Sequence, residues 1–240
     1  MKKHLRVTGV LFAKEAKDIL ANKNVSYMLL LPPLFTALYR FVLQDMTPAT
    51  ILLVGTVTNF SMVPVCILSM TIAEEKEKNT LRTLMLANVT GGEFLLGKCL
   101  AAGLYTLAVN AVIFLLSGLP PAGLPLFLLL LAFGLLGVMA LGALVGLVCR
   151  DQLSASMVGI PLIMFLMVTA MLQGQGGVWA LLARLNPAQV FLTLFFRLTD
   201  VFPPEELYSI PWCVGVLAAW AVGGAAAFGL LYRRNGLDKG

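Results

Sequence analysis

Apolar residues run along most of the chain in blocks long enough to cross a lipid bilayer. A spanning helix needs about 20 mostly apolar residues, because the hydrocarbon core is about 30 Å thick. Six blocks reach or approach that length: Val25–Leu43, Thr50–Ile72, Cys99–Leu119, Leu124–Cys149, Met157–Leu172 and Ile210–Tyr232. The pattern therefore predicts an all-α membrane protein with six transmembrane helices, and residues 1–240 are expected to form a single transmembrane domain.

Two segments outside these blocks are amphipathic. Before the first block, apolar residues recur at helical spacing opposite the charged side chains of Lys14, Lys17 and Asp18. The apolar face consists of Leu5, Phe12, Ala16, Ile19 and Leu20. Between the fifth and sixth blocks, Gln173–Ser209 contains two helical patterns separated by Asn186–Pro187. Because lipid does not tolerate irregular exposed backbone, we expect an N-terminal surface helix and a short re-entrant or interfacial helical pair.

The basic residues indicate which side of the membrane each connection faces. The chain has 17 Lys and Arg residues, and with a cytoplasmic N-terminus only Arg40, Arg184 and Arg197 fall on the outer side. The inner ones are Lys2, Lys3, Arg6, Lys14, Lys17, Lys23, Lys76, Lys78, Arg82, Lys98, Arg150, Arg233, Arg234 and Lys239. Since Lys and Arg concentrate in cytoplasmic connections, we expect a multi-pass plasma-membrane protein with both termini in the cytoplasm.

Composition agrees with lipid as the main solvent. The chain is 59% hydrophobic and 12% charged, whereas soluble domains carry about a quarter charged residues. The net charge of +5 does not indicate nucleic-acid binding, because the basic residues flank apolar blocks. The four cysteines are scattered and His4 is the only histidine, so we expect free thiols and no metal site. No Asp or Glu lies deep in a block, and no catalytic residue is predicted.

The connection between the second and third blocks, Ala73–Lys98, is charged and far longer than a simple turn requires. Asn79 or Thr80 is suited to cap a short helix within it. The apolar stripe of that helix would be Leu81, Leu84 and Met85. Thr90 and Glu93 then have the spacing of a capping box at the start of the third span. A capped, charged helix with a small apolar stripe is suited to docking against a soluble partner.

The same connection nearly matches a phosphate-binding loop at Gly92–Cys99. Such a loop needs a Ser or Thr hydroxyl after the lysine and a buried strand before the glycine. Cys99 replaces the hydroxyl, Glu93 would face the phosphate, and the preceding residues are polar. We therefore expect no nucleotide to bind to this chain.

In its order of residues this connection resembles the ABC-2 family of ABC transporter permeases. The matching positions are Glu75, Lys76, Lys78, Thr80, Leu81, Leu84, Leu86, Val89, Thr90, Glu93, Gly97 and Lys98. Asn79 and Asn88 stand where the family usually has Gly and Pro, and both can adopt turn conformations. The layout of an amphipathic N-terminal helix, six spans and an outer helical pair agrees over nearly the whole chain.

The resemblance implies that the connection is a cytoplasmic coupling helix that inserts into a partner ABC ATPase. The coupling residues would be Glu75, Lys76, Lys78, Thr80, Leu81, Leu84, Leu86, Thr90 and Glu93. We expect Leu81 and Leu84 to form an apolar ridge, with Glu75 and Lys78 on its polar rim. The alternative for this segment is an ordinary solvated connector.

The resemblance further implies a permease subunit of an ABC exporter, which couples ATP hydrolysis to efflux of an amphipathic substrate such as a drug, antibiotic peptide, natural product or lipid. ATP and Mg²⁺ would bind the partner ATPase, and this chain would hold no cofactor and perform no chemistry. A second permease chain, identical or not, and membrane lipids would be its other partners. The alternative function is a non-transporting membrane anchor or sensor that regulates or scaffolds an ATPase.

Two sets of residues within the spans leave alternatives open. Asn59 and Asn110 either hydrogen-bond neighbouring helices or line a substrate path. Small residues spaced four apart allow two helices to approach closely. We expect such residues to serve packing between helices of this chain, and the alternative is packing across a dimer interface. They are Gly142 and Gly146 in the fourth span, and Gly215, Ala219, Gly223 and Ala227 in the sixth.

Overall fold

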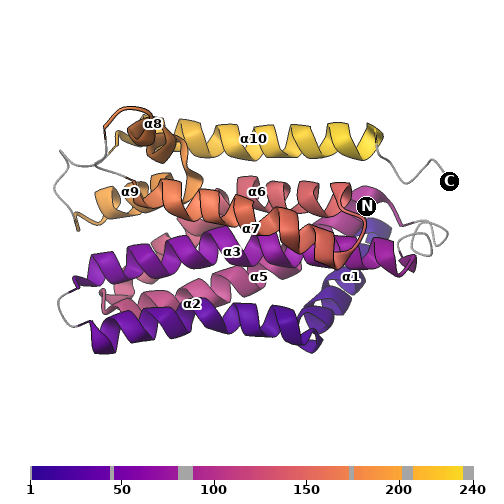
Figure 1. Ribbon diagram of the computed structural model, residues 1–240, viewed down its shortest axis with the longest axis horizontal. Helices are drawn as coiled ribbons and strands as arrows, with labels where there is room; N and C mark the ends of the chain where they lie inside the picture. The colour runs from indigo at the N-terminus through magenta and orange to yellow at the C-terminus, as the bar shows by residue number, and fades with distance from the viewer. Residues whose placement is uncertain (1, 44–45, 81–88, 173–175, 202–207, 235–240) are drawn as a thin grey trace.

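The computed structural model describes residues 2–43, 46–80, 89–172, 176–201 and 208–234 (Figure 1). Its elements in chain order are α1 (Lys2–Ala21), α2 (Lys23–Val42), α3 (Pro48–Glu77), α5 (Gly91–Ser117), the 3-10 turn η1 (Pro121–Gly123), α6 (Leu124–Val148), α7 (Gln152–Met171), α8 (Val178–Leu185), α9 (Pro187–Leu198) and α10 (Ile210–Arg234). No strand occurs within these ranges. The predicted all-α fold is confirmed.

Six helices of the described chain are long and apolar enough to cross a membrane, namely α2, α3, α5, α6, α7 and α10. They match the six predicted spans one to one. Figure 1 shows them aligned with the long axis of the molecule, with α1 at one end and α8 at the other. We refer to these as the α1 end and the α8 end. The prediction of a multi-pass helical membrane protein is therefore confirmed.

α3 and α5 extend further at the α1 end than their apolar patterns predict. α3 continues past Ile72 to Glu77, and α5 begins at Gly91 rather than at Cys99. With 30 residues, α3 measures about 45 Å at 1.5 Å per residue, which exceeds the hydrocarbon thickness of about 30 Å. The additional turns carry charged side chains and remain helical because those side chains find partners at this end.

α3 is the central helix of the bundle and packs against α2, α5, α6, α7 and α9. Its span is 78% buried, against 17% for α10. Two glycines bring α6 against it. A Cβ atom at Gly142 would lie 2.9 Å from Val65 Cα, and one at Gly146 would lie 2.9 Å from the Ser69 carbonyl oxygen. Backbones this close leave no room for a side chain, so this pair of glycines serves packing within the chain.

The small residues of α10 differ from those of α6. A Cβ atom at Gly215 or Gly223 would have no described atom within 4 Å. The close approach is made instead by Gly224, where a Cβ atom would lie 2.6 Å from Ala140 Cβ in α6. The interpretation as intrachain packing is therefore wrong for Gly215 and Gly223, because the face that α10 turns toward α6 passes through the neighbouring glycine.

The predicted helical pair between the last two spans is present at the α8 end. α8 and α9 meet at Asn186 with a bend of 73°. The Asn186 side chain accepts hydrogen bonds from the backbone N–H groups of Ala188 and Gln189, which caps the start of α9. α9 is buried along most of its length, and Phe191 stacks on Phe60 of α3. We expected the pair to be either re-entrant or interfacial. α9 is inserted into the bundle, which agrees with the re-entrant alternative.

Two tryptophans of α10 hold α8 in place. Trp212 Nε1 donates to the Arg184 carbonyl oxygen at 3.1 Å, and Trp220 Nε1 donates to that of Leu185 at 2.7 Å. The last carbonyls of a helix lack partners within it. The indoles therefore satisfy the exposed end of α8 and join the helical pair to the last span.

Candidate functional site

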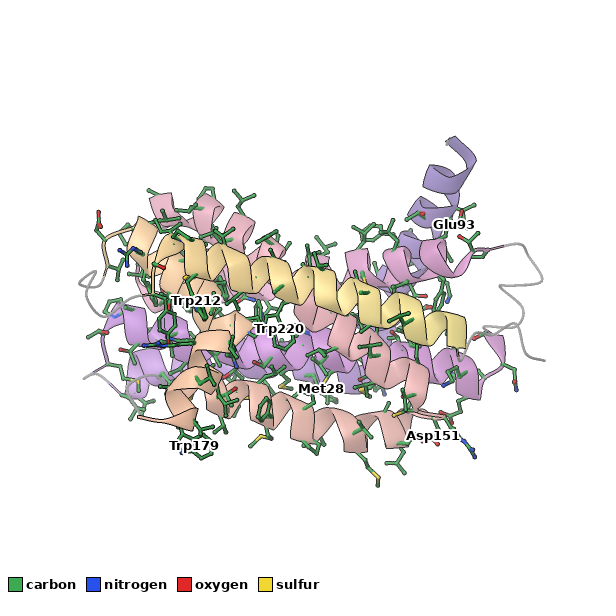
Figure 2. All side chains as sticks on the ribbon, turned by 90° about the horizontal axis from the view of Figure 1, so that it is seen from above. Met28, Glu93, Asp151, Trp179, Trp212 and Trp220 are labelled. Atoms are coloured by element: carbon green, nitrogen blue, oxygen red, sulfur yellow. The ribbon has the colours of Figure 1, made fainter. Side chains whose placement is uncertain are left out.

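The charged connection leaves the bundle where α3 ends and re-enters it where α5 begins, at the α1 end. Figure 2 places Glu93 and Asp151 at this end, with Trp179 and Trp212 at the opposite end. The predicted coupling residues that the structure describes are Glu75, Lys76, Lys78, Thr80, Thr90 and Glu93. Leu81, Leu84 and Leu86 lie outside the described residues.

Local backbone geometry marks both roots of the connection as the sequence predicts. Asn79 follows α3 in the left-handed conformation, with φ of 54°. At the other root, Thr90 and Glu93 form the expected capping box. The Thr90 N–H donates to Glu93 Oε2 at 2.8 Å, and the Glu93 N–H donates to Thr90 Oγ1 at 3.3 Å. The two ends of the connection are thus defined by a left-handed residue that ends α3 and a reciprocal cap that starts α5.

An ion cluster of Lys14, Glu15, Glu75 and Lys98 joins these two roots to α1. Lys98 Nζ lies 2.6 Å from Glu15 Oε2 and 3.1 Å from Glu75 Oε1. Lys14 Nζ lies 2.9 Å from Glu75 Oε1 and 3.1 Å from Glu15 Oε1. Glu15 and Lys98 are only 2% exposed, and Glu75 is 6% exposed. Two carboxylates and two ammonium groups balance in charge, which is the condition for burying ions at all.

The contact between α1 and α5 is close because Gly97 precedes Lys98. A Cβ atom at Gly97 would lie 2.9 Å from Leu11 Cβ, so only glycine lets α1 approach at this level. Tyr105 adds a hydrogen bond from its hydroxyl to the Ala16 carbonyl oxygen at 2.7 Å. The Gly-Lys pair of the motif therefore has a structural purpose. The glycine admits α1, and the lysine pairs with the carboxylate that α1 brings.

The position of Glu75 corrects one expectation. We expected it on the exposed polar rim of a docking surface, but its side chain is buried against Lys14 and Lys98. Sequence reasoning also missed Glu15. The face of α1 that is buried passes through Leu11, Glu15 and Ile19, which are spaced four residues apart. A carboxylate between two apolar residues on one helix face was the available signal, and it can be buried there because Lys98 compensates its charge.

Lys76 and Glu77 hold the turn between α6 and α7, residues 149–151. Lys76 Nζ donates to the Leu147 carbonyl oxygen at 2.6 Å and also to that of Cys149. Glu77 Oε2 accepts from the Gln152 N–H at 3.2 Å. A cation thus meets the carbonyl end of α6, and an anion meets the amide end of α7, as the two helix dipoles favour. Sequence reasoning did not single out Glu77, because its partner lies 75 residues away.

Lys14 and Lys78 are two accessible cations of this region. Burial of the Lys14 ammonium opposes its charge, but the hydrogen bond to Glu75 and the charges of Glu15 and Glu75 outweigh that effect and raise the pKa of Lys14. Lys78 is exposed and pairs with Glu74, whose hydrogen bond raises the pKa of Lys78. These groups and the ion cluster line a cavity of about 390 Å³ between α1 and the ends of α3 and α5.

The near-match to a phosphate-binding loop has the wrong geometry for that purpose. Gly92 to Lys98 forms the first turns of α5 instead of a loop. The Lys98 ammonium is already bound by Glu15 and Glu75. A phosphate would have to displace two carboxylates from a buried cation, so this segment is not shaped as a nucleotide site.

Asn59 and Asn110 lie deep in the bundle, away from the ion cluster. Both side chains are fully buried, and both donate to the carbonyl oxygen of Thr106, at 3.1 Å and 3.0 Å. Asn59 belongs to α3 and Asn110 to α5, so the shared acceptor joins the two helices. This geometry is that of interhelical packing. The role of either residue in a substrate path stays a prediction.

Comparison with known proteins agrees with this architecture. No curated protein matched the sequence in such a comparison. A sequence profile described as "ABC-2 family transporter protein" matches residues 14–232, which include α1 from Lys14, all six spans and the charged connection. The match covers well over half of the 240 residues. The chain therefore belongs to the ABC-2 family of transporter membrane proteins.

Proposed function

We propose that this chain is the permease subunit of an ATP-driven exporter. The observation that carries the proposal is that both roots of the charged connection are fixed in the bundle by the ion cluster and by Lys76 and Glu77. A solvated connector needs no such attachment. A segment that receives force from a partner does, because a displacement at its tip reaches the spans only through rigid roots.

In this mechanism, two permease chains enclose a path and two partner ATPases bind their cytoplasmic connections. ATP and Mg²⁺ bind the ATPases, whose closure displaces the connection. The bundle then exchanges inward for outward access, and the α8–α9 pair shapes the exit. Access changes because the ATPase binds the two states of the permease with different free energies. The spans carry few charges, which favours an amphipathic substrate such as a drug, peptide or lipid over a bare ion.

Docking of the ATPase should depend on the apolar ridge of the connection. Burying Leu81 and Leu84 contributes roughly 3–5 kcal/mol to such an interface. Changing both to Asp should therefore abolish co-purification of the ATPase and export, while leaving membrane insertion intact. Glu74→Gln is the matched control, because Glu74 is partly exposed and pairs with Lys78 in the same turn. The comparison is made at equal membrane expression, and a double variant that still binds its ATPase and exports normally contradicts the proposal.

A non-transporting anchor or sensor is the alternative, and it would share the same docking surface. Reconstituting the permease with its ATPase in liposomes separates the two functions. An exporter should hydrolyse ATP faster in the presence of substrate and move that substrate across the bilayer. An anchor should do neither. Screening for compounds that become more toxic when the permease is deleted supplies substrate candidates for this assay.

Orientation in the plasma membrane can be tested by cysteine labelling. We expect the α1 end to be cytoplasmic because fourteen of the 17 basic residues lie on that side of the predicted topology. In a variant without the four native cysteines, a membrane-impermeant maleimide should label Cys at Ala122 or Pro204 from outside. It should reach Cys at Asn79 or Lys239 only after the membrane is opened. The opposite labelling pattern would reverse the topology.

A further inference from the structure

α7 is held by polar contacts at both of its ends. At the α1 end, Glu77 accepts from the Gln152 N–H in the first turn of α7, and Lys76 binds the carbonyls that precede this turn. At the α8 end, Asn186 Nδ2 donates to the Leu166 carbonyl oxygen at 2.7 Å and to Thr169 Oγ1 at 2.8 Å. One end of α7 therefore contacts the root of the charged connection, and the other contacts the hinge between α8 and α9.

Between these ends, α7 is a single continuous helix that packs against α3 along one face and exposes the other. It spans Gln152–Met171 without interruption at Pro161. Only 33% of its span is buried. Large apolar side chains such as Met157, Phe165 and Val168 are exposed along it. Because α7 is unbroken and polar contacts fasten both of its ends, a displacement at one end can be carried to the other.

The second contact is specific to the hinge. Asn186 uses its side-chain oxygen to cap α9, through the N–H groups of Ala188 and Gln189, and its side-chain amide to bind α7. Asn186 is only 3% exposed, so water does not compete for these bonds. Any displacement of the outer turn of α7 thus acts directly on the residue at which α8 and α9 bend.

We propose that Lys76, Glu77 and Asn186 are positioning residues of the transport cycle, and that α7 carries displacement of the charged connection to the α8–α9 hinge. The inference rests on the proposed function. It adds a path of mechanical coupling through α7, which lies outside the predicted coupling segment. The contacts that Lys76 and Glu77 make in the structure lie inside this chain, on the turn between α6 and α7. They differ in this from Leu81 and Leu84, whose predicted role is docking.

The test follows the α8 end while nucleotide is bound at the other end. A bimane fluorophore is attached to Cys at Trp179, an exposed residue of α8, in the full chain without native cysteines and in complex with its ATPase. Trapping the complex with MgATP and vanadate should change the bimane emission. The variant Lys76→Met/Glu77→Ala, which removes both contacts with residues 147–152, should reduce this change about tenfold while the ATPase still co-purifies.

Three further variants make the test specific. Lys76→Arg/Glu77→Gln keeps a donor and an acceptor at the same places and should restore the emission change. Asn186→Ser keeps a good N-cap but loses the amide that binds α7, and it should reduce the emission change by the same factor. Combining Asn186→Ser with Lys76→Met/Glu77→Ala should cause no further loss, since both interrupt one route. Glu74→Ala, in the same turn of α3, should respond as the unchanged protein does.

The outcomes separate this inference from the proposed function. If no ATPase binds the unchanged chain, the proposed function fails. If the ATPase binds and hydrolyses ATP, but bimane at position 179 does not respond, only the route through α7 is overturned. An undiminished response in Lys76→Met/Glu77→Ala overturns it equally, as does a failure of Lys76→Arg/Glu77→Gln to restore the change.

Discussion

Replacing Lys98 with methionine should destabilise the protein by about 3–5 kcal/mol, because it leaves the Glu15 and Glu75 carboxylates buried with too little compensating charge. Lys14 cannot substitute fully, since its side chain is 44% exposed and already contacts both carboxylates. The measurement is thermal unfolding of the purified protein in detergent, followed with a thiol-reactive dye. Methionine preserves the length of the lysine stem, so the loss reports the charge.

Two comparisons establish the origin of that loss. Lys14→Met removes a half-exposed partner of the same cluster and should cost less than about 1 kcal/mol. Glu15→Gln combined with Lys98→Met removes one of the two buried carboxylates and leaves Lys14 to pair with the other, so this double variant should be more stable than Lys98→Met alone. If Lys98→Met unfolds at the same temperature as Lys14→Met, the cluster is solvated and cannot serve as a rigid root for the connection.

Replacing Gly142 with leucine should prevent α6 from packing on α3 and cost at least about 3 kcal/mol. The added Cβ would lie 2.9 Å from Val65 Cα and 3.0 Å from the Pro64 carbonyl oxygen, and these backbone atoms cannot move without shifting the central helix. We expect little monodisperse protein on size-exclusion chromatography in detergent. Gly223→Leu is the matched control in α10, because a Cβ atom at Gly223 would have no described atom within 4 Å apart from its own stretch of helix.

The surroundings of Gly223 make Gly223→Leu a suitable control. Gly223 lines a shallow groove of about 310 Å³ between α6 and α10, together with Leu141, Ala219 and Trp220. Gly223→Leu should elute as a folded chain with an unfolding temperature close to that of the unchanged protein. Loss of folding in this variant as well would mean that the two glycine repeats are equivalent, in conflict with the different surroundings of Gly142 and Gly223.

The sequence alone determined the features that depend on neighbouring residues. Apolar length predicts a span whatever the helix later packs against, so all six spans were identified, with bounds within a few residues except where polar turns extend α3, α5 and α7. The caps behave in the same way. Thr90 and Glu93 form the predicted capping box, and Asn186 lies at the predicted break between two helices, where its side chain caps α9. Asn79, which we expected to cap a short helix, instead adopts a left-handed turn conformation after α3. The resemblance to the ABC-2 family could also be recognised from the sequence, because its motif lies within one continuous segment, Ala73–Lys98.

Only the tertiary structure decided which elements meet. Glu15 and Lys98 are separated by 83 residues, so the sequence alone does not show which cation compensates the carboxylate on this face of α1. From the sequence, Glu75 was expected on the polar rim of the docking surface, whereas in the structure it is buried against Lys14 of α1 and Lys98 of α5. Gly142 and Gly223 belong to similar repeats, yet a Cβ atom at Gly142 would clash with the backbone of α3, whereas one at Gly223 would have no described atom within 4 Å apart from its own stretch of helix. A helical pattern specifies a face, but the partner of that face depends on how the other helices share the space around α3.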